Sequence, residues 1–257
     1  MPEFAHTIEL DLSGAIATLH FESDHPANVF TLPMLEELTE HVDSLGAERP
    51  CRVLVITGRD NIFSGGADLG SIQAMDAATY RKYVEVEYQL FRKIEMLPFI
   101  TIASIAGACV GNAAELVMAC DVRVASDKVK IGWPELNVAF DAPAQRLARF
   151  VGIGKAKEVL LSAKLLRADE ASSLGLLTTV VPRDELASAT REAAELYASR
   201  PPIGVALTKE NIERAYSFPS ENFTLEIDAA TIAFASEDFQ EGAAAVLGGR
   251  PPTFTGR

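Results

Sequence analysis

The sequence has few of the residues that build metal sites and disulfide frameworks. Only four histidines occur among 257 residues, all within the first 41 positions, and no CxxC or HExxH spacing appears. The cysteines are odd in number and lie within or beside apolar segments: Cys51, Cys109 and Cys120. These features argue against zinc hydrolase chemistry and against a disulfide framework. We therefore expect no metal site and a reducing, cytoplasmic location.

Long apolar runs and an excess of positive charge are also missing. No window approaches the roughly 18 uninterrupted apolar residues that a membrane-spanning helix needs, and the N-terminus does not resemble a targeting segment. Lys and Arg total 23 against 36 Asp and Glu, which gives a net charge of −13. This balance argues against a nonspecific nucleic-acid binder or a binder of anionic membranes. GxSxG, P-loop and GxGxxG signatures are likewise absent.

The apolar patterning that is present predicts an α/β protein with parallel strands. With 48% hydrophobic residues, the chain can bury a sizeable core. Alternating and continuous apolar runs predict a hairpin over 7–21 and strands over 52–58, 99–107, 121–126, 129–132 and 178–181. Helical spacing predicts helices over 33–45 and 76–96, and only helices after about residue 184. Strand, glycine turn and helix thus recur in the order typical of parallel sheets.

Two glycine-rich turns lie between a predicted strand and a helix. One is SGGADL at 64–69, and the other leads through Gly107 and Gly111 to Asn112. Free N–H groups at helix starts are donors for an oxygen that carries negative charge, so two such turns predict an oxyanion hole. The alternative is that these glycines only make tight turns.

Two glutamates follow the second glycine turn. Glu115 lies in the otherwise small or apolar stretch GNAAELVMAC, where an unpaired carboxylate would be costly. It is either a catalytic group or the third residue of a capping box that Asn112 begins. Glu135, in IGWPELN, is either a second acid/base group or an ordinary carboxylate of a loop or helix start. Together with two N–H donors, the two carboxylates suit proton transfer at carbon beside a stabilised enolate.

The same residues resemble a known family along essentially the whole chain. The segments concerned are HPANVFTLPMLEEL, VLVITGRDNIFSGGADL, ITIASIAGACVGNAAELVMACDVRVAS, KIGWPEL and SEDFQEGAAAVLGGRPPTFTGR. They are similar to the enoyl-CoA hydratase/isomerase (crotonase) superfamily. The resemblance implies a spiral of ββα units over residues 1–198. It also implies a C-terminal helical region, residues 199–257, that assembles homotrimers or dimers of trimers.

The resemblance also implies roles for individual residues. The backbone N–H groups of Ala67 and Asn112 would form the oxyanion hole, although the family usually has glycine at the second position. Glu115 and Glu135 would be the catalytic glutamates. Further contacts to the acyl-CoA would come from residues at four places along the chain: Ala27, Asn28, Ala67, Asp68, Leu69, Gly70, Asn112 and Phe254.

The implied reaction is addition of water to a trans-2-enoyl-CoA, with the CoA thioester as substrate and no further cofactor. The loop NVAFDAPAQRL after Glu135 is shorter than is usual in the family and brings Phe140, Asp141 and Pro143 to the acyl side. An enoyl-CoA double-bond isomerase or a specialised thioester-enolate reaction such as decarboxylation therefore remains an alternative. A noncatalytic acyl-CoA-binding scaffold is the alternative from another class. In the tail, Arg250, Arg257 and Phe254 are candidates for contacts to the CoA of a neighbouring subunit, or else part of a solvated end.

Overall fold

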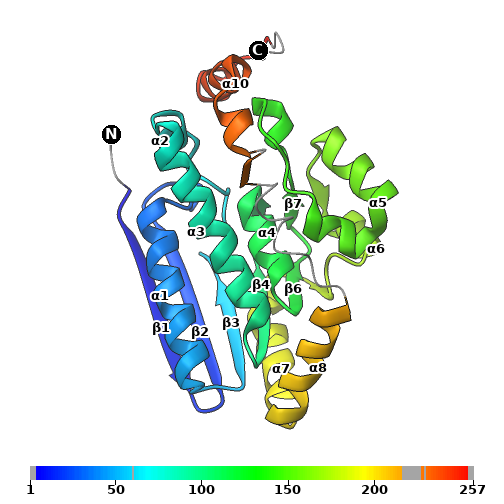
Figure 1. The fold of residues 1–257 in the computed structure, drawn as a ribbon. Helices are drawn as coiled ribbons and strands as arrows, with labels where there is room; N and C mark the ends of the chain where they lie inside the picture. The colour runs from blue at the N-terminus through cyan, green and yellow to red at the C-terminus, as the bar shows by residue number, and fades with distance from the viewer. Residues whose placement is uncertain (1–3, 60, 216–226, 229, 254–257) are drawn as a thin grey trace.

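A six-stranded sheet forms the centre of the molecule. The computed structural model describes residues 4–59, 61–215, 227–228 and 230–253 (Figure 1). The sheet has the order β1-β2-β3-β4-β6-β9. Its strands are β1 (His6–Ser13), β2 (Ile16–Ser23), β3 (Val53–Thr57), β4 (Ile100–Ile105), β6 (Val122–Ser126) and β9 (Thr179–Val181). The first two strands form the predicted antiparallel hairpin, and each later neighbour pairs in parallel, as predicted.

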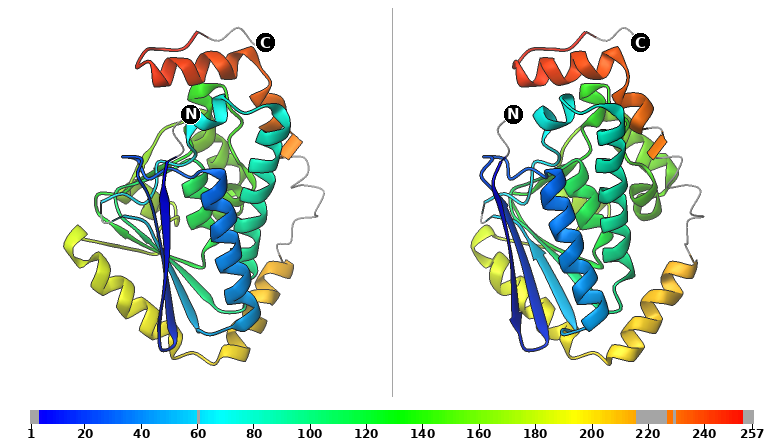
Figure 2. Two further views of the ribbon diagram at one scale, coloured as in Figure 1. Left: turned by 90° about the vertical axis from the view of Figure 1, so that its left-hand side faces the viewer. Right: turned by 60° about the vertical axis from the view of Figure 1, so that its left-hand side comes forward.

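Helices cover both faces of this sheet. The longer ones are α1 (Leu32–Glu48), α3 (Ala77–Met96), α5 (Gln145–Ser162), α7 (Leu186–Ala198), α8 (Pro202–Ala215) and α10 (Glu237–Leu247). The shorter ones are α2 (Leu69–Gln73), α4 (Asn112–Ala119), α6 (Ala168–Ser173) and the 3-10 turns η1 (Glu135–Val138) and η2 (Arg183–Glu185). Figure 2 shows α1 and α3 on one face of the sheet and α7 on the other. The central strands are buried between these layers, which explains their continuous apolar runs.

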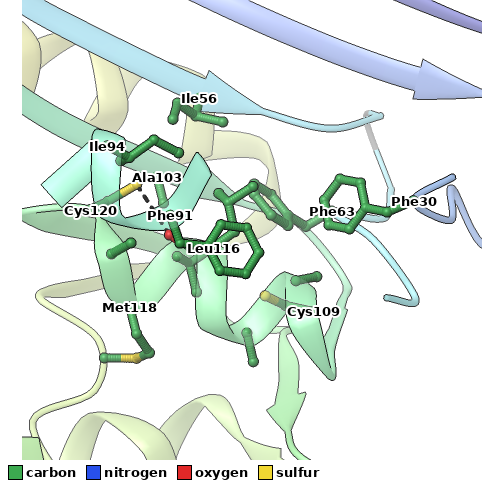
Figure 3. Packing of buried hydrophobic residues seen from close by; sticks show 14 of the residues in the cluster. Phe30, Ile56, Phe63, Phe91, Ile94, Ala103, Cys109, Leu116, Met118 and Cys120 are labelled. Carbon is green, nitrogen blue, oxygen red and sulfur yellow. Dashed lines mark hydrogen bonds between the residues drawn. The ribbon is translucent and has the colours of Figure 1, made fainter. Parts of the chain in front are cut away.

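A second, three-stranded sheet sits beside the first and leads into the buried helix α4. Its strands are β5 (Ala108–Val110), β7 (Lys130–Gly132) and β8 (Leu166–Arg167). Every residue of α4 is buried. Figure 3 shows Leu116 and Met118 of this helix, and Cys120 directly after it, in the same apolar cluster as Phe91 and Ile94 of α3. Helix α4 is therefore held in place by packing along its whole length.

The start of α4 differs from the capping box considered above. Gly111, with φ of 61°, is the N-cap residue, and Asn112 is the first residue of the helix. No side chain caps this end. The capping interpretation of Glu115 is therefore wrong, because Asn112 is already helical and its side chain bonds elsewhere.

The C-terminal helices lie at two ends of the molecule (Figure 1). Helix α7 ends at Ala198 and α8 begins at Pro202, so the predicted division at 198/199 falls in the connection between them, and it stays a prediction. Helix α10 packs on η1 and α2. A Cβ at Gly242 would lie 2.5 Å from the carbonyl carbon of Val138, so only glycine permits this close approach. No helix in the described ranges has both the length and the apolar content to cross a bilayer.

Candidate active site

A cavity of about 470 Å³ opens where the two glycine turns, α3, η1 and α10 meet. Its wall is largely apolar. Residues from all five of these segments line it, among them Ala67, Asn112, Val84, Glu135 and Phe239. A concave apolar site with a few polar groups is the usual form of a small-molecule site. The cavity therefore brings together the two predicted oxyanion donors and one predicted glutamate.

In the first glycine turn, the N–H of Ala67 points away from Phe30, the residue with which Ala67 is paired. Phe30 and Ala67 form a parallel bridge in which the N–H of Phe30 donates to Gly66 O at 2.8 Å and the N–H of Asp68 donates to Phe30 O at 3.1 Å. Gly66 has φ of 92°, and a Cβ there would lie 2.5 Å from the carbonyl oxygen of Val110. The turn thus sits directly against the end of β5.

The second donor is the N–H of Asn112, at the start of α4. Strand β5 ends at Val110, so the close approach of Gly66 places the two turns side by side. Within the described residues, neither the Ala67 N–H nor the Asn112 N–H has a protein acceptor. Both residues line the cavity. Two free donors on one cavity are the feature that an oxyanion hole requires.

Glu135 begins η1, after Pro134, and also lines the cavity. A Cβ at Gly111 would lie 3.2 Å from its Oε1, so the carboxyl group is close to the start of α4. Its Oε2 is buried and has no hydrogen-bond partner within the described part of the chain. Burial, with the nearby carboxylates of Glu115 and Glu87, raises the pKa of Glu135 to about 8. At neutral pH this group is mainly a carboxylic acid that can give a proton.

Glu115 is buried beside the cavity but is not one of its lining residues. Its Oε1 accepts a hydrogen bond from Trp133 Nε1 at 2.8 Å, and its Oε2 accepts one from Arg146 Nη1 at 3.1 Å. Arg146 also donates from Nε to Glu95 Oε1 at 2.7 Å. Burial raises the pKa of Glu115, while Arg146 opposes that rise. The Glu115 carboxylate in this apolar stretch is therefore paired with the guanidinium of Arg146, which it shares with Glu95, and with the indole N–H of Trp133.

The sequence interpretation missed a carboxylate in the cavity wall. Glu87, on α3, is only 7% exposed and lines the cavity. The Asn112 side chain donates from Nδ2 to Glu87 Oε2 at 3.0 Å and to Tyr83 Oη at 2.8 Å. Burial raises the pKa of Glu87 to about 8, while the bond from Asn112 acts in the opposite direction. Helical spacing gave a signal for this residue, since it lies seven positions after Tyr80 and three after Val84, both buried on the apolar face of α3.

An aromatic cluster closes one side of the cavity. Tyr80 stacks on Phe234 with ring centroids 4.3 Å apart, and it meets Phe140 edge to face at 5.3 Å. Phe140, Asp141 and Pro143 of the short loop line the cavity, where the sequence placed them. Burial raises the pKa of Asp141. The loop after η1 therefore helps shape the wall that an acyl group would meet.

The remaining predicted contacts vary in their position. Leu69 lines the cavity, whereas Asp68 caps α2 by accepting the N–H of Ser71 at 3.2 Å. Gly70 follows within that helix and does not line the cavity. Ala27 accepts the N–H of Gly65 at 2.7 Å through its carbonyl oxygen, which fixes the first glycine turn.

Asn28 and the tail residues are tied into the protein or lie outside its described part. Asn28 is fully buried, and its side chain accepts the Ser23 N–H and donates to Phe63 O, both at 2.7 Å. Arg250 donates two hydrogen bonds of 2.7 Å to Glu241. Phe254 and Arg257 lie outside the described residues. No group of three or more side chains suited to holding a metal occurs within the described ranges.

Comparison with known proteins gives consistent matches over the whole chain. A family model described as enoyl-CoA hydratase/isomerase matches residues 11–257. A crotonyl-CoA hydratase of Syntrophomonas wolfei is 31% identical over 259 residues, which cover 96% of this chain and 97% of that protein. A short-chain-enoyl-CoA hydratase of Clostridium acetobutylicum is 30% identical over 240 residues, covering 92% and 89%.

Solved structures give the same answer for the fold. The crystal structure of an enoyl-CoA hydratase from Mycobacterium avium subsp. paratuberculosis K-10 matches with a TM-score of 0.88 and 25% identity, covering 96% of this chain and 98% of that one. An enoyl-CoA hydratase from Bacillus anthracis matches with a TM-score of 0.78 and 30% identity, covering 97% and 99%. The predicted fold, a spiral of ββα units with a helical C-terminal region, is confirmed.

Proposed function

Because this chain belongs to the enoyl-CoA hydratase/isomerase family, we propose that it adds water across the C2–C3 double bond of a trans-2-enoyl-CoA. The observation that carries the proposal is the pair of free N–H groups, on Ala67 and Asn112, that face one cavity beside Glu135. Attack at C3 moves negative charge onto the thioester oxygen. Donors placed where that charge develops stabilise the transition state, each by about 3 kcal/mol.

Glu135 supplies the proton for C2 in this proposal. Its raised pKa keeps it protonated near neutral pH, and its Oε2 has no competing partner in the described part of the chain. General acid help of this kind contributes about 10²- to 10⁴-fold in rate. Hydration adds OH to C3 and H to C2 from one water molecule without net oxidation or reduction, so the proposed reaction requires no redox cofactor.

A short, apolar acyl group suits the cavity best. The aromatic wall around Tyr80, Phe140 and Phe239 supports an apolar occupant. Two relatives bear the names short-chain-enoyl-CoA hydratase and crotonyl-CoA hydratase. The first substrate to test is therefore crotonyl-CoA.

Assembly and location belong to the same proposal. Side chains on α8 are exposed and apolar, with Ile203 76% and Leu207 54% exposed, and Ile232 is 74% exposed. Phe223 and Leu225, two apolar residues of the same C-terminal region, lie outside the described residues. Apolar surface of this kind suits association between subunits, as a trimer or a dimer of trimers. All three cysteines are free and buried, which fits a reducing cytoplasm.

The test is loss of the conjugated-thioester absorbance of crotonyl-CoA, with the product identified by mass. A panel that adds a 3-enoyl-CoA and a β-carboxyacyl-CoA separates hydration from isomerisation and decarboxylation. Glu135→Gln should lower kcat by about 10²- to 10⁴-fold, because the amide keeps the shape and loses the proton. The control is Glu158→Gln, which changes an exposed carboxylate on α5. Binding of acyl-CoA with no turnover in the panel would favour the scaffold alternative.

A further inference from the structure

We propose that Glu87 and Asp141 are specificity-determining residues that exclude acyl groups ending in a carboxylate, so that the site takes uncharged 2-enoyl thioesters. This inference rests on the proposed hydration, in which the thioester oxygen meets the Ala67 and Asn112 N–H groups and the acyl group lies in the cavity beside them. Glu87 lies on α3 and Asp141 on the loop after η1, and both line that cavity. Two separate elements thus each bring a carboxyl group to the acyl-binding wall.

The Glu87 carboxyl group is held in place by the side chain of Asn112. Asn112 Nδ2 donates to Glu87 Oε2 at 3.0 Å and to Tyr83 Oη at 2.8 Å, so both hydrogens of this amide are engaged. The bond favours the charged form of Glu87. It also leaves Asn112 Nδ2 with no hydrogen to offer to a carboxylate on the substrate.

Two buried oxygens at the cavity have no donor within the described residues. One is the Oδ1 of Asn112, a residue that is 8% exposed, and the other is the Oε2 of Glu135. A Cβ at Gly66 would lie 3.2 Å from Asn112 Oδ1, so this oxygen points toward the first glycine turn. A substrate carboxylate has only acceptor oxygens, and it would meet further acceptors here.

Cations are missing from the described part of the cavity wall. No lysine, arginine or histidine occurs among the lining residues that the structure describes. Arg146 acts electrostatically on Glu87, but it is 2% exposed, does not line the cavity, and donates to Glu95 and Glu115. A carboxylate on the acyl group would therefore give up its hydration without gaining a cationic partner from this wall, which is costly.

The ring of Tyr80 shows that the carboxyl groups act on one region of the cavity. Burial is the largest cause of its raised pKa, and the charges of Glu87, Asp141 and Glu135 all add to the rise. All three carboxyl groups are therefore within electrostatic reach of the same phenol. Tyr80 also meets Phe140, the neighbour of Asp141, edge to face at 5.3 Å. An acyl group that reaches this aromatic wall comes under the influence of the same charges.

The exclusion should depend on pH, because Glu87 changes its charge near neutrality. Burial is the largest influence and raises the pKa of Glu87 to about 8. The titratable and charged groups around it come from four elements: Tyr80 and Tyr83 on α3, Glu115 on α4, Arg146 on α5 and Glu135 on η1. Below this pH, neutral Glu87 can donate a hydrogen bond to a substrate carboxylate, and above it the two groups repel. Discrimination against an anionic acyl group should therefore increase as the pH rises through that range.

The experiment compares two enoyl thioesters of equal size. In 4-carboxybut-2-enoyl-CoA the acyl group ends in a carboxylate, and in 5-methylhex-2-enoyl-CoA an isopropyl group takes its place. The readout is the ratio of kcat/KM for the neutral thioester to kcat/KM for the anionic one, so that effects common to both substrates divide out. A like charge about 5 Å away lowers affinity by about 10²-fold at the effective dielectric constant of a protein, so the wild-type ratio at pH 8.5 should reach about 10² or more. At pH 6.5 the ratio should be about tenfold smaller, because Glu87 is then neutral.

Isosteric variants assign this ratio to the two residues. Glu87→Gln and Asp141→Asn should each lower the ratio at pH 8.5 by about tenfold or more, because each removes one like charge and keeps the side-chain shape. Glu85→Gln is the matched control and should leave the ratio unchanged, because it alters a carboxylate on the same helix that pairs with Arg81 at the surface. The Asp141→Asn arm and the pH dependence of the wild type keep the test informative if Glu87→Gln folds poorly.

A third thioester separates charge from polarity. The acyl group of 4-carbamoylbut-2-enoyl-CoA has the shape of the anionic one without its charge, so its kcat/KM should lie closer to that of the isopropyl thioester. Rejection of the carbamoyl thioester as strong as that of the carboxylate would overturn the inference, because charge would then not be the cause.

Other results would overturn the inference while leaving hydration in place. One is a wild-type ratio below about threefold at pH 8.5, and another is a ratio that neither Glu87→Gln nor Asp141→Asn changes. A ratio that falls as the pH rises would contradict the assignment to Glu87. A wild-type protein that hydrates neither crotonyl-CoA nor the isopropyl thioester would remove the proposed function itself, and this inference with it.

Discussion

Replacing Arg146 by Met tests the buried ion pair that holds Glu115. Arg146 lies on α5, and its guanidinium contacts Glu95 at 2.7 Å and Glu115 at 3.1 Å, with each of the three side chains less than 10% exposed. Burial alone would lower the pKa of Arg146, but the two carboxylates raise it overall. Methionine keeps most of the side-chain length and removes the charge. The variant therefore removes the charge and its hydrogen bonds to Glu95 and Glu115 while keeping most of the side-chain volume.

The expected loss of stability is large because Glu115 has no second cation in the described structure. Glu95 keeps Arg92, at 3.1 Å, but Glu115 keeps only the Trp133 indole. Removing one partner of a buried ion pair costs about 3–5 kcal/mol. For a chain of this length each kcal/mol lowers the melting temperature by about 2–4 °C, so the expected fall is about 6–20 °C.

The loss of stability in Arg146→Met should depend on pH, and the pKa of Glu115 determines the direction of that dependence. Burial already raises the pKa of Glu115, and loss of Arg146 removes the group that opposes this rise. A carboxyl group with a raised pKa in the folded state stabilises the fold below its unfolded pKa, and that contribution is lost as the pH rises toward the folded pKa. The difference between Arg146→Met and wild type should therefore be smaller at pH 5 than at pH 8.

Thermal unfolding at fixed protein concentration measures both effects, since association between subunits would shift the melting temperature by mass action. Lys155→Met is the matched control, because it removes a cation on the same helix whose pair with Glu158, at 2.6 Å, is exposed. A surface pair of this kind contributes at most about 1 kcal/mol. Equal melting temperatures for Arg146→Met and wild type, or a larger difference at pH 5, would refute the reasoning.

Three further changes test other parts of the site and its support. Gly111→Ala should lower kcat, because Gly111 has φ of 61° and the new Cβ would lie 3.2 Å from Glu135 Oε1. Unchanged steady-state kinetics would contradict the placement of the Glu135 carboxyl group. Lys209→Met should destabilise the fold by about 1–3 kcal/mol, because Lys209 donates hydrogen bonds to Phe99 O at 2.8 Å and to Asp121 at 2.6 Å. Chemical denaturation measures this change in the free energy of unfolding. Glu135→Gln should raise the melting temperature at pH 8.5 and have little effect on it at pH 5. The reason is that the pKa of Glu135 is raised from 4.5 to about 8, so its buried negative charge destabilises the fold only as the pH rises through that range. A Glu135→Gln protein that is less stable than wild type at pH 8.5 would show that the carboxylate has a partner there.

The fold was largely predictable because its elements carry local signals. The hairpin has alternating apolar residues around Ser13–Gly14, and α1 has Pro33 at its start. The strands β3 and β4 are continuous apolar runs of a kind that needs cover on both faces. Helix α5 was missed, since Gly152 and Gly154 interrupt its pattern. Gly152, with φ of 76°, in fact makes a kink within it.

The candidate site was predictable only in part, for a different physical reason. The two N–H donors follow from glycine turns, which are local. The partners of Glu115 are not local, because Trp133 and Arg146 are 18 and 31 positions away along the chain. Glu87 is one of three glutamates in α3, and in the sequence only its helical spacing relative to Tyr80 indicates that it lies on the buried face.

The charge state of each glutamate at this site follows from its donors. Glu115 faces a guanidinium and an indole N–H, so its negative charge is matched inside the protein. Glu135 has an Oε2 with no donor in the described structure, so burial favours its neutral form. Glu87 lies between these cases, with one amide donor and a cavity in front of it. The neutral form of Glu135 is the form that can give a proton to C2, so the lack of a donor at its Oε2 suits the proposed role of general acid.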